Sequence, residues 1–242
     1  MLLLAGSATA LATGLGAIPV FLLGERSRVL RPALWGFASG TMAVASVVGL
    51  LLPAADEGSA TELVGGTALG IAFMLSVRRF LDRHQLRVAG MDAVRVRTSA
   101  LVFSVLLVHS APEGLAIGTA YASETAGLGL FVILAIALQN VPEGTSTAIP
   151  MAAAGFSRKQ QFWAAVLTSA PQPVTAVVAF LLVEEVTALL PISFAFAAGA
   201  MLALVAFELI PQALAEGRWQ GALVGGAAGA ALMLALAAVL GV

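Results

Sequence analysis

The chain has 242 residues, of which 60% are hydrophobic and only 10% are charged, and its mean hydropathy is +1.00. These values lie outside the range of ordinary soluble domains and predict an all-α integral membrane protein. The formal net charge of -1 argues against a nucleic-acid partner, and the lack of cysteine excludes a disulfide framework and thiolate metal ligands.

Apolar runs long enough to cross a ~30 Å hydrocarbon core recur along the whole chain. The first run could be taken for a secretory signal, but it lacks a basic amino-terminal region and stays apolar as far as Leu23. No soluble domain is left over, so 1–242 is predicted to be a single transmembrane domain. The eight predicted spans cover residues 2–23, 33–53, 62–81, 98–121, 127–151, 160–183, 192–214 and 220–242.

The charges between the spans predict the orientation of the chain. With the amino terminus outside, all 12 Lys and Arg residues fall in the inner connections, the largest being the basic cytoplasmic loop 78–97. The positive-inside rule therefore predicts that both termini are external. The outer connections then carry only acids, which either gather cations or are simply solvated: Asp56, Glu57, Glu62, Glu124, Glu184 and Glu185.

Three acidic residues fall inside predicted spans, namely Glu113, Glu143 and Glu208. A charged carboxylate near the bilayer centre costs about 3 kcal/mol on insertion scales, so each is by default a functional hypothesis. No buried Lys or Arg is predicted that could neutralise these acids, since Arg78 and Arg79 stand at the inner end of their span. A bound cation is the simplest compensation.

Two of the three glutamates belong to related motifs, HSAPEG in the fourth span and QNVPEG in the fifth. His109 and Glu113 are four residues apart, as are Gln139 and Glu143, so each pair shares one face of its helix. Consecutive spans are antiparallel, so the two faces can meet near mid-membrane. One imidazole, two carboxylates and one amide oxygen would then converge. The alternative for a single motif is a hydrogen bond within one helix that serves packing.

The prolines and glycines of the two motifs fit a binding site. Pro112 and Pro142 cannot donate a backbone hydrogen bond, which predicts a kink and a freed carbonyl beside each polar pair. Gly114 and Gly144 allow a neighbouring helix to approach closely. Nitrogen and carboxylate ligands without sulfur suit Zn(II), Fe(II), Mn(II), Co(II) or Cd(II).

An internal repeat connects the second and seventh spans. GFASGTMAV and AFAAGAMLA match at a constant offset, from Phe37 to Phe196 and from Gly40 to Gly199. In the predicted topology the two spans run in opposite directions, so the repeat is inverted. We therefore predict a 3+2+3 arrangement with the motif helices in the centre, a symmetry that favours alternating access.

The sequence resembles the ZIP (Zrt/Irt-like) family of divalent-metal transporters, closest to its prokaryotic GufA-like branch. The resemblance covers nearly the whole chain and is carried by HSAPEGLAIG and QNVPEG, supported by GFASGTMAVASVVGLLLPA and FAAGAMLALVAFELIP. It implies a homodimer in the lipid bilayer of a prokaryotic inner membrane that carries Zn²⁺, or related Cd²⁺, Fe²⁺, Mn²⁺ or Co²⁺, to the cytoplasm. Neither a prosthetic group nor enzymatic activity is expected.

The resemblance also implies roles for individual residues. Asp56 matches an acid at the external entrance, and Glu208 matches an acid on the inner route. The implied metal ligands are His109, Glu113, Gln139 and Glu143.

Relatives with two metals use a second site beside the first, and this chain departs from that pattern. Ser110, Asn140 and Gln172 stand where those relatives present other ligands, so the second metal site is degenerate. Two dications would bring four positive charges against the two negative charges of Glu113 and Glu143, and neutral side chains cannot supply the difference. We predict one metal ion per protomer.

Two further functions remain open from the residues. A metal-sensing or structural membrane protein without transport would carry the same motifs. An intramembrane zinc hydrolase is the other alternative, but HExxH is absent and the only other histidine, His84, falls in the basic loop.

Overall fold

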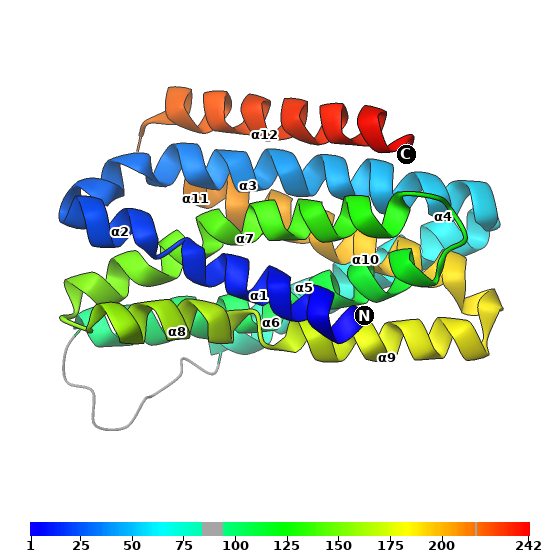
Figure 1. Ribbon diagram of the computed structural model, residues 1–242, viewed down its shortest axis with the longest axis horizontal. Helices are drawn as coiled ribbons and strands as arrows, with labels where there is room; N and C mark the ends of the chain where they lie inside the picture. Colours follow the sequence, from blue (N-terminus) through cyan, green and yellow to red (C-terminus); the bar gives the residue numbers. More distant parts are fainter. Residues whose placement is uncertain (84–93, 216) are drawn as a thin grey trace.

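The computed structural model describes residues 1–83, 94–215 and 217–242, and within these ranges the chain is helical and has no β-strand (Figure 1). The predicted all-α fold is confirmed. Seven helical segments in these ranges are long and apolar enough to cross a membrane, which makes the chain a multi-pass membrane protein. His84 and the central part of the basic loop 78–97 lie outside the described residues.

The helices follow one another along the chain with short connections. The 3₁₀ turns are η1 (Gly24–Leu30) and η3 (Thr187–Leu189), and the π-helical turns are η2 (Val47–Leu51) and η4 (Val205–Leu209). The α-helices are α1 (Leu2–Leu15), α2 (Ile18–Leu23), α3 (Arg31–Ser46), α4 (Leu52–Glu57), α5 (Ala60–Arg83), α6 (Val94–Ala122), α7 (Leu128–Ala153), α8 (Arg158–Thr168), α9 (Pro171–Glu185), α10 (Leu190–Leu204), α11 (Ile210–Leu214) and α12 (Trp219–Leu240).

Helix α6, which carries HSAPEG, is not among the seven candidate spans. It has 29 residues and so measures about 44 Å at 1.5 Å per residue, which is long enough to cross a bilayer. The count of eight spans and the 3+2+3 layout stay predictions.

Local sequence explains where several helices begin and end. Gly127 takes a positive φ of 80° immediately before α7, and Gly241 ends α12 with a φ of 72°, conformations in which glycine carries no Cβ penalty. Ser157 and Gln160 form a capping box at the start of α8. Pro171 begins α9, where its missing N–H has no helical partner to lose.

The two segments of the sequence repeat share an unusual backbone feature. Each consists of a long α-helix, a π-helical turn and a short α-helix, first as α3, η2 and α4 and then as α10, η4 and α11. A proline follows each π turn, Pro53 in the first and Pro211 in the second. Because proline removes a hydrogen-bond donor from the helical ladder, it favours such local rearrangement. Glu208 lies within the second π turn.

Glycines bring the helices together in close pairs. A Cβ added to Gly40 of α3 would collide with the backbone of α12, and one added to Gly70 of α5 would collide with that of α10. Gly118 of α6 faces α9 in the same way, and Gly144 of α7 faces α1. Small residues allow backbones to approach where helices pack inside a membrane. The predicted role of Gly144 in close helix approach is therefore confirmed, and Gly114 also abuts α9.

Helix α7 lies in the interior of the bundle, where it packs against α1, α3, α6 and α8 (Figure 1). Its motif residues are consequently covered by helices on several sides. Both chain termini lie towards one end of the bundle, since Tyr121 of α6 donates to Met1, and the end of α12 lies beside Gly127. Both motif helices continue through Pro112 and Pro142 without interruption.

Candidate metal site

The two motif helices meet through their glutamate and glutamine side chains. Nε2 of Gln139 on α7 donates to Oε1 of Glu113 on α6, with 2.7 Å between the two atoms. The side chains of Glu113 and Glu143 lie close enough for two negative charges to repel each other. All four side chains predicted as ligands are buried, and His109, with 5% of its surface exposed, is the most accessible of them.

Three atoms of this group are buried and have no hydrogen-bond partner among the residues that the structure describes. They are Nδ1 of His109, Oε1 of Gln139 and Oε1 of Glu143. Buried polar atoms are almost always paired, and an unpaired one costs about 1–3 kcal/mol. Imidazole nitrogen, amide oxygen and carboxylate oxygen are all ligands for a borderline dication such as Zn²⁺.

The site does not have the geometry of a bound metal. Among the described residues, no three His, Asp or Glu side chains converge closely enough to hold an ion together. Gln139 presents its NH₂ group to Glu113, whereas the sequence suggested that its amide oxygen would join the ligands. An ionised carboxylate accepts hydrogen bonds only, so without a cation it is satisfied by donors.

Two of the residues predicted to form a degenerate second site, Asn140 and Gln172, hydrogen-bond each other through their amides. Nε2 of Gln172 donates to Oε2 of Glu113 at 2.7 Å and to Oδ1 of Asn140 at 3.3 Å. Nδ2 of Asn140 in turn donates to Oε1 of Gln172 at 3.1 Å. Ser110 donates to the backbone oxygen of Leu106 in its own helix. Each oxygen of Glu113 therefore receives an amide N–H, and the space beside it is occupied by neutral groups.

Thr9 of α1 completes this network, and the sequence analysis did not select it. Its hydroxyl donates to Oε1 of Gln172 at 2.7 Å, and its backbone oxygen accepts from Nδ2 of Asn140 at 2.8 Å. Since Oε1 of Gln172 already accepts two donors, the NH₂ group of Gln172 must face Glu113. One signal was visible in the sequence, because Thr9 and Thr13 stand four residues apart in a span whose only other hydroxyl residue is Ser7.

The structure does not bring Asp56 to the ligands. Asp56 is exposed in α4, and its neighbour Glu57 lines an open cavity of about 820 Å³ together with Glu124 and Glu184. Carboxylates gathered around one hollow create a negative potential that raises the local concentration of cations. Three of the six acids predicted to be external therefore line one cavity, and Glu57 rather than Asp56 is among them.

Glu208 lies on the other side of the ligands. It is half-buried and lines a small cavity together with His109 and Arg78. This cavity measures only about 10 Å³, close to the minimum that one water molecule needs. In this conformation the space that His109 and Glu208 both line is therefore no larger than about one water molecule.

A multi-pass helical bundle with imidazole, carboxylate and amide groups buried between two interior helices defines a membrane protein of the transporter class, in which intramembrane ionisable residues mark ion pathways. A model of the ZIP zinc transporter family matches residues 82–237, which is more than half of the chain. The chain belongs to the ZIP family. It is therefore a transporter-family protein and not an enzyme, and the hydrolase alternative is set aside.

Proteins from several organisms are similar to this chain in sequence. Zinc transporter GufA of Myxococcus xanthus is 33% identical over 222 residues, covering 87% of this chain and 85% of the relative. Zinc transporter ZIPB of Bordetella bronchiseptica is 34% identical over 251 residues, covering 98% and 81%. A protein of Arabidopsis thaliana is 35% identical over 214 residues, but this chain spans only 34% of its length. The similarity to GufA agrees with the predicted branch.

Proposed function

We propose that this protein carries zinc across the membrane through His109, Glu113, Gln139 and Glu143. The observation that carries the proposal is the set of three buried ligand atoms without hydrogen-bond partners on two facing helices. A dication placed among them would satisfy all three. The two glutamates would balance its charge in a low-dielectric interior.

Binding requires side-chain movements and no new residues. Rotation of the Gln139 amide would turn Oε1 towards the cation in place of the NH₂ group. Glu113 would then lose this hydrogen-bond donor and contact the cation instead. The four side chains would then supply one nitrogen and three oxygen ligands, which matches the four-coordination that zinc prefers.

One zinc ion per protomer is the stoichiometry that the amide pair supports. The NH₂ group of Gln172 directs the positive end of its dipole at Glu113, where a second cation would need an acceptor. Apart from Glu113 and Glu143, the side chains of this network are neutral. The related dications Cd²⁺, Fe²⁺, Mn²⁺ and Co²⁺ are candidate competitors for the same site.

The wider setting of transport follows from the family resemblance. We include in the proposal a homodimer in a prokaryotic inner membrane and movement of the ion towards the cytoplasm by alternating access. Asp56 and Glu208 belong to its outer and inner routes. The acid-lined cavity of Glu57, Glu124 and Glu184 supports the entry of cations from that end.

Entry of radioactive zinc into proteoliposomes tests the proposal. The wild type should show saturable entry, and Glu143→Ala should abolish it. Glu185→Gln is the matched control because it removes a carboxylate from an exposed position, and it should retain entry. A folded wild type that binds zinc but shows no flux would instead support a sensor.

A further inference from the structure

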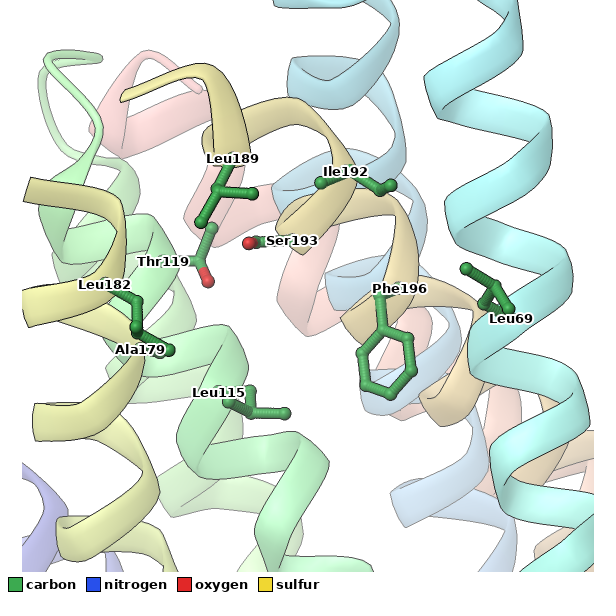
Figure 2. A pocket seen from close by; sticks show the side chains of 9 residues that line it. All are labelled: Leu69, Leu115, Thr119, Ala179, Leu182, Leu189, Ile192, Ser193 and Phe196. Carbon is green, nitrogen blue, oxygen red and sulfur yellow. The ribbon is translucent and has the colours of Figure 1, made fainter. Parts of the chain in front are cut away.

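A third cavity lies away from the proposed metal ligands, between the α6–α9 pair and the α5–α10 pair. It has a volume of about 240 Å³ and an almost entirely apolar lining from these helices and η3 (Figure 2). Leu115 of α6, Phe196 of α10 and Leu69 of α5 surround its lower part in the view of Figure 2. None of the proposed zinc ligands lines it.

One hydroxyl group that lines this cavity has no hydrogen-bond partner within the described part of the chain. Thr119 is completely buried, and its Oγ makes no hydrogen bond. Figure 2 shows the hydroxyl groups of Thr119 and Ser193 pointing into the space between the helices. A buried hydroxyl without an acceptor is unfavourable, so a ligand that offers a carbonyl oxygen would stabilise this site.

The polar and apolar parts of the cavity lie at different depths. Thr119 lies within one turn of the end of α6, and Ser193 lies in the first turn of α10. Leu115 and Phe196 lie about one turn further along these helices, away from the ends. A ligand that matches this order has its polar group near the membrane surface and its apolar part deeper.

The rim of the cavity faces the surroundings of the bundle. Leu69 and Leu182 line it and are 59% and 54% exposed. Around a membrane-spanning helix the surrounding medium is hydrocarbon. The volume is below the ~300–1,000 Å³ of sites that enclose a whole small molecule, so the cavity suits a segment of a longer chain.

We propose that the cavity binds the ester-linked beginning of one acyl chain of a glycerophospholipid. The Thr119 hydroxyl donates to the ester carbonyl oxygen, and the first methylene groups pack against Leu115 and Phe196. A chain in this place lies between two closely packed helix pairs and stabilises their relative position. The site is separate from the zinc ligands, so lipid binding does not depend on transport.

Photo-crosslinking tests this assignment with the full-length protein in vesicles of phosphatidylethanolamine and phosphatidylglycerol. The probe is phosphatidylcholine with a diazirine group near the ester end of one chain, and peptide mapping locates the labelled residues. Label should appear at Leu115 and Phe196. Thr119→Val should weaken this labelling about fivefold, the effect of one neutral hydrogen bond.

Two variants separate the cavity from the general lipid surface. Ala179→Leu fills the cavity from α9 and should abolish the label there, whereas Val174→Leu enlarges an exposed side chain of the same helix and should leave it unchanged. Equal labelling in wild type and Ala179→Leu would overturn the proposal. A cross-link that joins two copies of the chain at Leu69 would also overturn the lipid proposal, because a second protomer would then cover the cavity. Zinc binding by each variant verifies its fold.

Discussion

The side-chain nitrogen of Gln172 lies 2.7 Å from Oε2 of Glu113, so an amide from α9 donates to this carboxylate. A second metal ion would need the negative charge of the same carboxylate. This contact joins α6 to α9 at the centre of the bundle. We therefore expect the side chain of Gln172 to limit how many metal ions the site can hold. Changing that side chain should change the number of ions.

Gln172→Glu should allow a second zinc ion to bind. The substitution removes the NH₂ donor and adds a third carboxylate beside Glu113 and Glu143, which lowers the cost of two adjacent dications. Elemental analysis after dialysis should give two zinc ions per protomer in the variant and one in the wild type. Gln160→Glu is the control, since glutamate serves a capping box equally well at this exposed position. One zinc ion in both proteins would contradict the charge argument.

His109→Leu should separate metal binding from stability. The variant loses a proposed ligand, and its zinc affinity should fall by more than the ~10–100-fold typical of changes to groups that only support ligands. The metal-free protein should be as stable as wild type or slightly more stable, because a buried nitrogen without a partner disappears. Calorimetric titration and thermal unfolding with chelator measure the two quantities. Marked destabilisation of the metal-free variant would show that His109 has a structural role.

Thr9→Val should destabilise the protein through the amide pair. It removes the donor to Oε1 of Gln172 without a large change in volume, at a cost of about 1 kcal/mol. For a chain of this size that corresponds to a fall in Tm of about 2–4 °C. Thr9→Ser keeps the hydroxyl and should unfold close to the wild-type temperature. Equal losses in both variants would mean that packing of the methyl group, and not the hydrogen bond, is responsible.

Gly144→Ala should weaken the contact between α1 and α7. A Cβ at this position would overlap the backbone oxygen of Thr13, so the helices must separate, at a cost of about 1–3 kcal/mol. Gly65→Ala on α5 is the matched control, because no atom lies within 4 Å of the added Cβ. That control should be neutral or stabilising, since alanine favours helix. Thermal unfolding of both variants in the same detergent tests the difference.

Much of the fold could be predicted from the sequence because its signals are local. A run of apolar residues predicts a span without knowledge of its neighbours, and the four-residue spacing of His109 and Glu113 places both on one face of one helix. The expectation of a transporter and not an enzyme came from the resemblance, and the ZIP family match supports it. The family resemblance was visible in HSAPEG and QNVPEG themselves.

The contacts between distant segments could not be predicted in this way. Thr9 meets Asn140 and Gln172 only after three helices have packed, so no spacing in the sequence reveals the contact. The orientation of the Gln139 amide depends on which groups surround Glu113. The choice between Asp56 and Glu57 as a lining residue depends on how α4 is rotated, which the apolar pattern of a short helix leaves open.

The three unpaired atoms at the site have a consequence for the energetics of the empty protein. Each carries a cost of about 1–3 kcal/mol that exists before any ion arrives. Part of the affinity for a dication is then relief of this cost and not the strength of the new bonds. If the proposed site binds zinc, its two glutamates and two neutral ligands would therefore retain an ion that the same groups would hold only weakly on an exposed surface.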